Sequence, residues 1–286
     1  MQKIGLLTCS NIPDLISADQ KMIPLLQSAG FDAQAVIWND INVDWSLFSA
    51  LVFRNTWDYY ELADDFMTWL DHIGRLEIPI FNPLPVIKKN LHKFYLNDFE
   101  QKGVTIIPSI FVPKGQLSKM ISQIPIHWDR LIFKPAISAG SYLTVFFDRK
   151  EMDKILEDYQ DINLQKDLII QPFLSQIQNE GEISIVFFDK VYSHAVIKRP
   201  KSGDFRIQSQ FGGRYNAFTP SPSLLKTAYD IVNKIPEDLL YARVDGIMID
   251  GQFYLMELEL IEPDLYFEFA QGGQQVFIDT LIKKLH

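Results

Sequence analysis

Residues 242–263 read ARVDGIMIDGQFYLMELELIEP, which predicts two strands joined by a turn at Asp250-Gly251. Side chains two residues apart in a strand face the same side, so Glu257 and Glu259 point one way while Leu258 points into a core. Adjacent carboxylates repel each other, and a hard divalent cation such as Mg²⁺, usually bound together with phosphates, removes that cost. A solvated edge strand with acidic side chains is the alternative. The apolar neighbours of the two glutamates favour burial, and therefore a metal site.

The length of the turn decides whether Asp245 joins this pair. A two-residue turn at Asp250-Gly251 would pair Asp245 with Met256 and place Asp245 and Glu257 on opposite faces. A three-residue turn, or an equivalent bulge, places Asp245 on the same face as both glutamates. We expect the longer turn or the bulge, and with it three acids on one face: Asp245, Glu257 and Glu259.

A second segment, residues 133–141, places Lys134 at the end of a predicted strand and follows it with a loop of small residues. Ser138, Gly140 and Ser141 lack large side chains, so backbone N–H groups in this loop are free to approach phosphate oxygens. The lysine adds a positive charge. A strand end with a plain turn is the alternative, and the spacing is not that of a P-loop.

Two other segments carry weaker signals. A single helix is expected over 86–103, with Lys89 and Lys93 on one face, where a solvated basic surface is the alternative. The apolar strand 168–172 opens into an irregular segment, followed by Glu182. Backbone groups freed there suit an adenine edge, and a nearby carboxylate suits ribose hydroxyls, although a purely structural role explains the same residues.

Composition narrows the possible functions. The 286 residues suggest two or three domains, and a hydrophobic fraction of 47% is enough for buried cores. A net charge of -9 without a long Lys/Arg cluster argues against a nucleic-acid partner. The single cysteine, Cys9, permits no intramolecular disulfide and fits a reducing compartment. Since no apolar run approaches the roughly 18 residues of a membrane span, we expect a cytoplasmic protein without a membrane partner.

The order of expected elements divides the chain into three parts. Alternating strands and helices predict an α/β N-terminal domain with a parallel sheet over residues 1–88. Strands dominate afterwards, so two α+β units are expected, a small one over 89–167 and a C-terminal one with the metal site over 168–286.

Taken in this order, the four segments resemble the ATP-grasp superfamily, whose enzymes hold ATP between two α+β subdomains behind an α/β N-terminal domain. The resemblance implies ATP and Mg²⁺, or Mn²⁺ in its place, with the metal held by Asp245, Glu257 and Glu259. It also implies a nucleotide site made of Lys93, Lys134, Ser138, Gly140, Ser141, Gln171, Pro172, Phe173, Leu174, Glu182 and Lys198. The chain departs from the pattern in two places: the loop after Lys134 has one glycine where many relatives have several, and Glu259 stands where many have Asn.

Within the superfamily, the chain is similar to the branch near bacterial glutathione synthetase and the cyclo-ligase of D-cycloserine biosynthesis. The segments that carry this similarity are 54–59, 198–206 with Gly212-Gly213, and 242–246 with 257–259. It implies a substrate side formed by Arg54, Trp57, Arg206, Gly212 and Gly213, and catalytic roles for Lys134, Arg206 and Arg243. Residues 199–213 combine loop residue types with several cations, so we expect a lid that closes over ATP and substrate. A plain surface hairpin is the alternative.

The implied reaction activates a carboxylate with ATP and passes the acyl phosphate to an amine, within or between small amino-acid-like or peptide-like molecules. The resemblance leaves open whether the protein forms a homo-oligomer, because ATP-grasp relatives are often dimers or tetramers. Two alternatives remain: an ATP-grasp kinase without an amine acceptor, and a nucleotide-binding regulatory protein without turnover. The set of clustered acids disfavours the regulatory protein, since their repulsion costs stability unless a metal offsets it.

Overall fold

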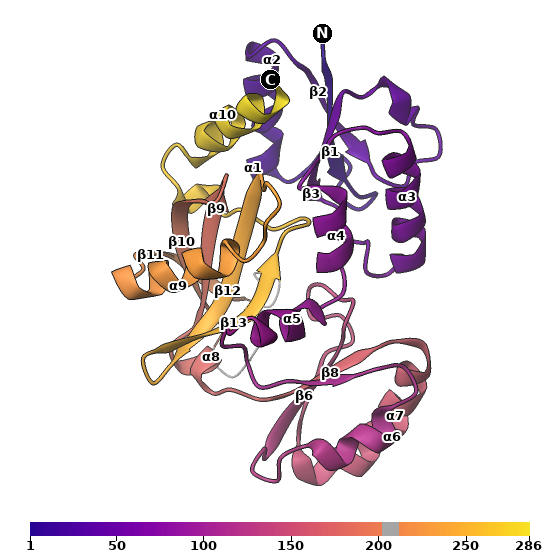
Figure 1. The fold of residues 1–286 in the computed structure, drawn as a ribbon, viewed down its shortest axis with the longest axis vertical. Helices are drawn as coiled ribbons and strands as arrows, with labels where there is room; N and C mark the ends of the chain where they lie inside the picture. The colour runs from indigo at the N-terminus through magenta and orange to yellow at the C-terminus, as the bar shows by residue number, and fades with distance from the viewer. Residues whose placement is uncertain (202–211) are drawn as a thin grey trace.

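The computed structural model describes residues 1–201 and 212–286, which form three sheets arranged along the molecule (Figure 1). The predicted architecture, an α/β domain followed by two α+β subdomains, is confirmed. In the described residues, no helix is both long and apolar enough to cross a membrane.

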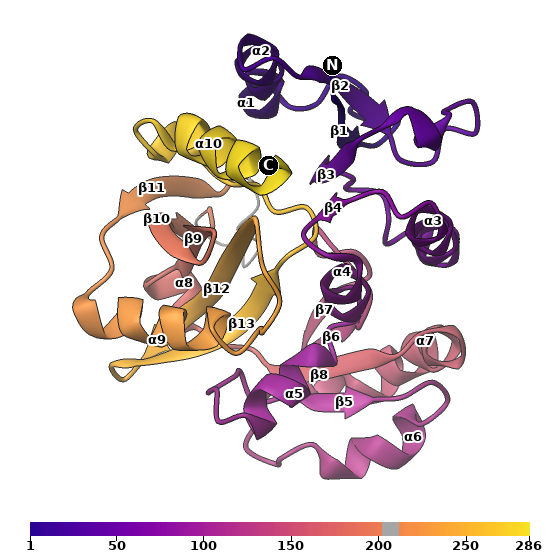
Figure 2. The same cartoon turned by 45° about the horizontal axis from the view of Figure 1, so that its top comes forward.

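The N-terminal sheet is parallel and has the strand order β2-β1-β3-β4. Its elements are β1 (Lys3–Thr8), α1 (Ser17–Gln20), α2 (Met22–Ser28), β2 (Asp32–Ile37), β3 (Ala50–Asn55), α3 (Ala63–Arg75) and β4 (Ile80–Phe81). β3 is buried along its whole length, as expected of a parallel strand covered on both faces. One face packs on α3, and the other packs on α2 and on the C-terminal helix α10 (Gly273–Leu285), so the end of the chain returns to the N-terminal domain (Figure 2).

The small subdomain is an antiparallel sheet of order β5-β8-β6-β7, with helices α6 and α7 on one side. Its elements are β5 (Ile110–Val112), α6 (Leu117–Met120), β6 (Arg130–Pro135), β7 (Val145–Asp148), α7 (Met152–Gln165) and β8 (Leu168–Pro172). β8 pairs with both β5 and β6. Residues 168–172 therefore belong to this sheet, and the expected boundary at residue 168 falls too early, because backbone pairing and not the change in sequence pattern defines the unit.

The large subdomain is an antiparallel sheet of order β11-β10-β9-β12-β13. Its elements are α8 (Gln176–Asn179), β9 (Glu182–Phe188), β10 (Val191–Arg199), β11 (Arg214–Phe218), α9 (Pro222–Val232), β12 (Tyr241–Ile249) and β13 (Gln252–Glu259). α9 covers one face together with residues of the earlier helix pair, α4 (Leu84–Asn90) and α5 (Tyr95–Gln101). The single helix expected over 86–103 is thus two helices, and Lys93 lies in the break between them.

Side chains from this helix pair cover the open edge of β13. The hydroxyl of Tyr95 exchanges hydrogen bonds with both backbone groups of Leu258 at 2.9 and 3.0 Å. The amide of Asn90 donates to the carbonyl of Leu258 at 2.8 Å and accepts from the N–H of Leu260 at 3.0 Å. An edge strand left bare would expose unpaired backbone groups, so these contacts fix the strand that carries the acidic residues.

The β12–β13 hairpin contains both a two-residue turn and a bulge. Asp250 and Gly251 form the turn with φ of 49° and 80°, so the turn itself is the shorter of the two considered. The register then shifts, because Gly246 pairs with Leu255 whereas Asp245 pairs with Glu257, which leaves Met256 as the extra residue. The expected bulge is present, and it puts Asp245 on the same face as Glu257.

Candidate active site

Lys93 ties three parts of the chain together. Its backbone N–H donates to the carbonyl of Ala136 at 2.8 Å. Its ammonium donates to the carbonyl of Ser138 and lies 3.0 Å from Oε1 of Glu257 on β13. The structure therefore brings together one predicted nucleotide lysine, the loop of small residues after β6, and an acid of the large sheet.

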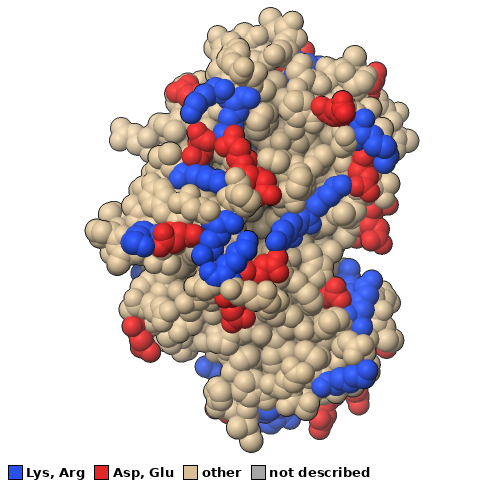
Figure 3. Space-filling view, viewed as in Figure 1, with Lys and Arg blue, Asp and Glu red and all other residues tan. Residues whose placement is uncertain are grey.

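Lys134, at the end of β6, approaches the same place. Burial lowers the pKa of its amine to about 8, against the opposing effect of Glu257, and Lys93 lowers it further. In the loop that follows, Gly140 has a φ of 58°, and a Cβ built there meets nothing within 4 Å. A partly buried amine beside open backbone fits an anionic ligand. On the face seen in Figure 3, acidic and basic side chains gather across the middle of the molecule.

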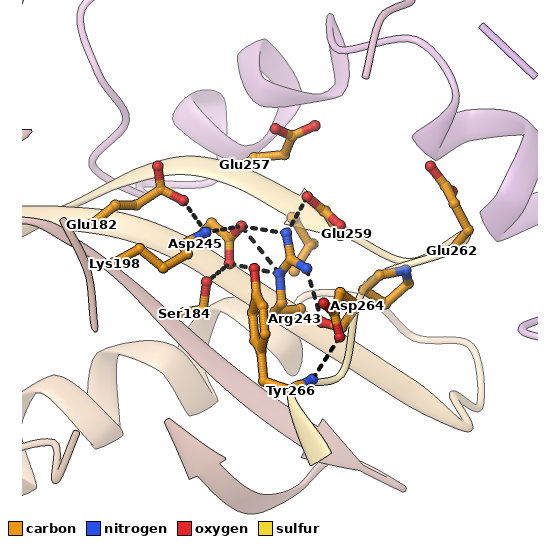
Figure 4. A network of polar contacts seen from close by, with 12 residues as sticks. Glu182, Ser184, Lys198, Arg243, Asp245, Glu257, Glu259, Glu262, Asp264 and Tyr266 are labelled. Carbon is orange, nitrogen blue, oxygen red and sulfur yellow. Dashed lines mark hydrogen bonds and ion pairs between the residues drawn. The ribbon is translucent and has the colours of Figure 1, made fainter. Parts of the chain in front are cut away.

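A buried network of alternating charges lies on the adjacent strands β10, β9, β12 and β13 (Figure 4). Nζ of Lys198 is 2.5 Å from Oε1 of Glu182 and 3.3 Å from Oδ2 of Asp245. Nη2 of Arg243 is 2.8 Å from the same Asp245 oxygen and also contacts Glu259. Arg243 and Asp245 thus face the same side of the sheet, as their spacing predicts.

The network fixes the charge of Asp245. Although burial opposes ionisation, Arg243 and Lys198 lower the pKa of its carboxyl to about 2. The hydroxyl of Ser184 also donates to Oδ1 of Asp245 at 2.6 Å. For Glu259 the balance is reversed, because burial raises its pKa to about 8 in spite of Arg243. Asp245 is held as a carboxylate with both oxygens engaged, whereas burial works against the ionised form of Glu259.

The expected metal site of three acids is not assembled in this arrangement. Among residues 1–201 and 212–286, no group of three His, Cys, Asp or Glu side chains is placed to hold a metal ion. The physical reason is the network, since the oxygens of Asp245 are occupied by Arg243, Lys198 and Ser184. Glu257 and Glu259 keep 34% and 26% of their side-chain surface exposed, so they fit a cation that also binds phosphate oxygens.

The residues expected to line adenine lie at the end of β8 and just beyond it. Gln171 is buried and donates to the hydroxyl of Ser109 at 2.8 Å. Phe173 packs under the guanidinium of Arg130 at 4.5 Å. Leu174 is half-buried and packs against a small apolar cluster that includes the bulge residue Met256. The segment thus joins the two sheets, with apolar surface from both sides.

The expected substrate residues lie in different environments. Arg54 is fully buried, with Nη2 3.1 Å from Oδ2 of Asp19 and 3.2 Å from the carbonyl of Pro263. Its guanidinium braces the N-terminal sheet against the segment after β13, which does not fit its expected place among the substrate residues. Trp57 is half-buried, and its indole N–H donates to the carbonyl of Glu262 at 2.9 Å. Gly212 and Gly213 precede β11. Arg206 and most of the expected lid lie outside the described residues.

Sequence reasoning missed three residues of this region: Tyr266, Tyr59 and Glu262. The ring of Tyr266 lies 5.0 Å from the guanidinium carbon of Arg243 and 5.8 Å from Nζ of Lys198. Tyr59 is buried and hydrogen-bonded to the carboxyl of Glu262. The sequence offers two signals: Glu262 is a third acid after Glu257 and Glu259, and Tyr59 is one of the aromatic residues that follow Arg54. Neither signal indicates which side chains contact each other.

Two comparisons of the sequence find proteins of cycloserine biosynthesis. The family model for the N-terminal domain of D-cycloserine synthetase DcsG matches residues 4–82. The cycloserine biosynthesis protein DcsG of Streptomyces lavendulae is 27% identical over 289 residues, which cover 93% of this chain and 94% of that protein.

Solved structures show the same fold. The crystal structure of D-cycloserine synthetase DcsG superposes with a TM-score of 0.88 at 23% identity, covering 99% of this chain and 100% of that one. D-alanine–D-alanine ligase from Bacillus anthracis superposes with a TM-score of 0.69 at 14% identity, covering 100% and 97% of the two chains. These structures show that the chain has the fold of ATP-grasp ligases, and the N-terminal match and the relative along nearly the whole length show that its sequence is similar to that of DcsG.

Proposed function

We propose that the protein activates the carboxylate of a small amino-acid-like substrate with ATP and transfers the acyl group to an amine, of a second molecule or of the same one. The observation that carries the proposal is the meeting of Lys93, the loop after β6 and Glu257, since it joins the two sheets at one point. Relatives named for D-cycloserine and for D-alanine support an amino-acid-like substrate.

The residues of the chain would act mainly by placing charge. Lys134 and Lys93 would bind triphosphate oxygens beside the open backbone at Gly140. Positioning and charge neutralisation account for most of the rate in phosphoryl transfer, so little covalent chemistry falls to the protein. Half-buried apolar side chains between the sheets, among them Leu174 and Met256, would contact the base.

Glu257 and Glu259 would hold Mg²⁺ together with the phosphates, and the ion would neutralise charge on the transferring phosphoryl group. Asp245 would act differently, as the anchor that orients Arg243 and Lys198 at the same face. Arg243 would then be positioned to stabilise negative charge on the substrate carboxyl group as the amine attacks.

The test is a screen of D- and L-amino acids and dipeptides for ADP release by the purified protein, with hydroxylamine present to trap an acyl phosphate as a hydroxamate. We expect ADP and hydroxamate in equal amounts with the true substrate, and neither with Lys134→Ala. ADP accompanied by a stable phosphorylated product would show a kinase instead. Absence of ADP release with every compound, despite tight ATP binding, would favour a regulatory protein.

A further inference from the structure

Glu262 is a buried acid that the proposed reaction does not use. It follows the end of β13 by three residues and is 8% exposed. Its carboxyl accepts a hydrogen bond from the hydroxyl of Tyr59, a buried residue of the N-terminal domain. Figure 4 shows the Glu262 side chain apart from the charged network, and no dashed line reaches it.

Among the described residues, Glu262 and Asp58 are the buried acids without an ion pair, and Asp58 accepts a hydrogen bond from the indole N–H of Trp38 at 2.7 Å. The other buried acids each have a cation beside them. Asp19 is 3.1 Å from Arg54, Glu182 is 2.5 Å from Lys198, and Asp245 is 2.8 Å from Arg243. In the part of the chain that the structure describes, no ion pair reaches Glu262. A buried carboxyl without a compensating charge is costly as an anion, and here burial, reinforced by Glu259, raises the pKa of Glu262 well above its usual range.

Glu262 lies at an edge of the N-terminal sheet where this class of fold commonly binds ligands. The N-terminal sheet has the order β2-β1-β3-β4, so its connections reverse direction between β1 and β3, and open α/β sheets bind ligands beyond the strand ends at such a point. The loop after β3 supplies Thr56, Trp57 and Tyr59 there. Trp57 fixes the Glu262 backbone through its indole N–H at 2.9 Å. The hydroxyl of Thr56 is buried and has no hydrogen-bond partner among the described residues.

The same carboxyl also lies within electrostatic range of the proposed reaction centre. Glu259, Lys93 and Glu257 all act on Glu262, and Glu257 and Glu259 also act on Tyr59. A cation beside Glu262 would therefore lie within electrostatic range of the proposed phosphoryl-transfer site, and would supply the charge that the acid lacks.

We propose that Glu262, oriented by Tyr59 and Trp57, binds the ammonium group of the substrate and selects amino acids over acids without an amine. The inference rests on the proposed ligase function. It adds a specificity residue from the segment after β13, and gives the N-terminal loop a role in substrate choice rather than in nucleotide binding.

The test compares matched probes by calorimetry in the presence of Mg²⁺ and a non-hydrolysable ATP analogue: alanine and serine of both hands against lactate and glycerate, which replace the ammonium by a hydroxyl. We expect the wild-type protein to prefer at least one amino acid over its hydroxy acid by about 10- to 100-fold, as for a charge-assisted contact. Glu262→Gln, which keeps the shape and the Tyr59 contact, should bring this ratio close to one while leaving affinity for the ATP analogue unchanged.

Two further variants separate this role from folding. Glu262→Asp should restore part of the preference, because it keeps the charge. Glu268→Gln, an exposed acid in the same segment, should leave both affinities unchanged. A wild-type protein that binds amino acids no better than hydroxy acids, or binds neither, overturns the proposal, as does an unchanged ratio in Glu262→Gln. ADP release by the wild-type protein with a carboxylate lacking an amine would leave the ligase function standing while this proposal fails.

Discussion

Asp245 lies directly opposite Glu257 across β12 and β13, and Arg243 lies opposite Glu259. A two-residue turn alone would have placed Met256 opposite Asp245 and sent the acids to opposite faces. The bulge at Met256 shifts the pairing register by one residue, so that the two charged pairs of β12 and β13 share one side of the sheet. The charge distribution at the candidate site therefore depends on one extra residue in a strand.

Gly246→Ala should destabilise the protein by about 1–3 kcal/mol or more, because a Cβ at residue 246 would lie 2.3 Å from the carbonyl oxygen of Tyr254 within the bulge. Urea unfolding of wild type and variant measures the loss. Gly251→Ala is the control: its φ is 80° but nothing lies within 4 Å, so only the backbone penalty of about 1 kcal/mol applies. Equal losses in the two variants would show that the bulge tolerates a side chain.

The sequence was sufficient to place the two strands that carry Asp245 and Glu257, the acidic pair and the loop after Lys134, because each depends on local spacing. It was not sufficient for contacts that need the register of several strands at once. Lys198 meets Asp245 only because β9 lies between β10 and β12. Because these contacts could not be read from the sequence, a metal site of three acids was expected. In the structure, Arg243 and Lys198 instead pair with the carboxylate of Asp245.

ATP affinity should fall as the pH rises through 8. Burial lowers the pKa of Lys134 to about 8 in the free protein, so above this pH the amine must first take up a proton before it pairs with phosphate. The dissociation constant of the Mg²⁺-bound ATP analogue should increase by roughly fivefold between pH 8 and 9. Calorimetry in two buffers of different ionisation enthalpy would also show proton uptake on binding.

Lys134→Arg is the matched control for this pH dependence. A guanidinium stays charged throughout the range, so the dissociation constant of the variant should stay level between pH 7 and 9, even if its absolute value is weaker. A wild-type affinity that is equally level over that range would contradict the assignment of Lys134 to the phosphates.

Glu257→Gln should remove the Mg²⁺ dependence of nucleotide binding with little effect on the metal-free fold. The side chain keeps 34% of its surface exposed, and its pair with Lys93 is partly solvated, so a stability change within about 1 kcal/mol is expected. Binding of the ATP analogue with and without Mg²⁺ gives the readout, and thermal melts without metal give the control. Full enhancement by Mg²⁺ in the variant would exclude Glu257 as a ligand.

His194 should make the protein less stable in mild acid. Burial lowers its pKa, although the carbonyls of Leu265 and Tyr266 oppose this, and Nε2 lies 2.8 Å from the Leu265 oxygen. The unfolded chain then binds the proton more readily, so stability is present above the unfolded pKa near 6.5 and is lost as the pH falls below it. His194→Gln keeps a donor for Leu265, and should narrow the difference in unfolding free energy between pH 7.5 and 5.5. The exposed His72→Gln should not change that difference.

The role of Arg54 shows a second limit of sequence reasoning. An arginine at the end of a strand, next to Asn, Thr and Trp, indicates an anion site as readily as a buried ion pair. The pairing with Asp19 and the contact to Pro263 depend on the segment after β13 returning to the N-terminal sheet. The same return creates the environment of Glu262, which no local pattern distinguishes from a surface acid.

Asn82→Ala should cost about 3 kcal/mol or more. The side-chain amide of Asn82 donates to the carbonyls of Tyr241 and Leu260 at 2.8 and 2.9 Å, and its oxygen accepts from the N–H of Leu240 at 2.7 Å. Asn82 is fully buried, so truncation leaves backbone groups of the large sheet without partners, each worth about 1–3 kcal/mol. Urea unfolding measures the loss.

The control for Asn82 is Asn90→Ala, which removes two hydrogen bonds to β13 from a partly buried position, and should cost less unfolding free energy.

The Asn82 contacts also hold the N-terminal domain against the start of β12 and the end of β13. At temperatures where Asn82→Ala is still folded, its preference for amino acids over hydroxy acids should therefore fall more than its affinity for the ATP analogue. The reason is that Trp57 belongs to the N-terminal domain, whereas Glu262 belongs to the segment after β13. Equal weakening of both, or a variant as stable as wild type, would show that other contacts between the domains set the position of the N-terminal loop.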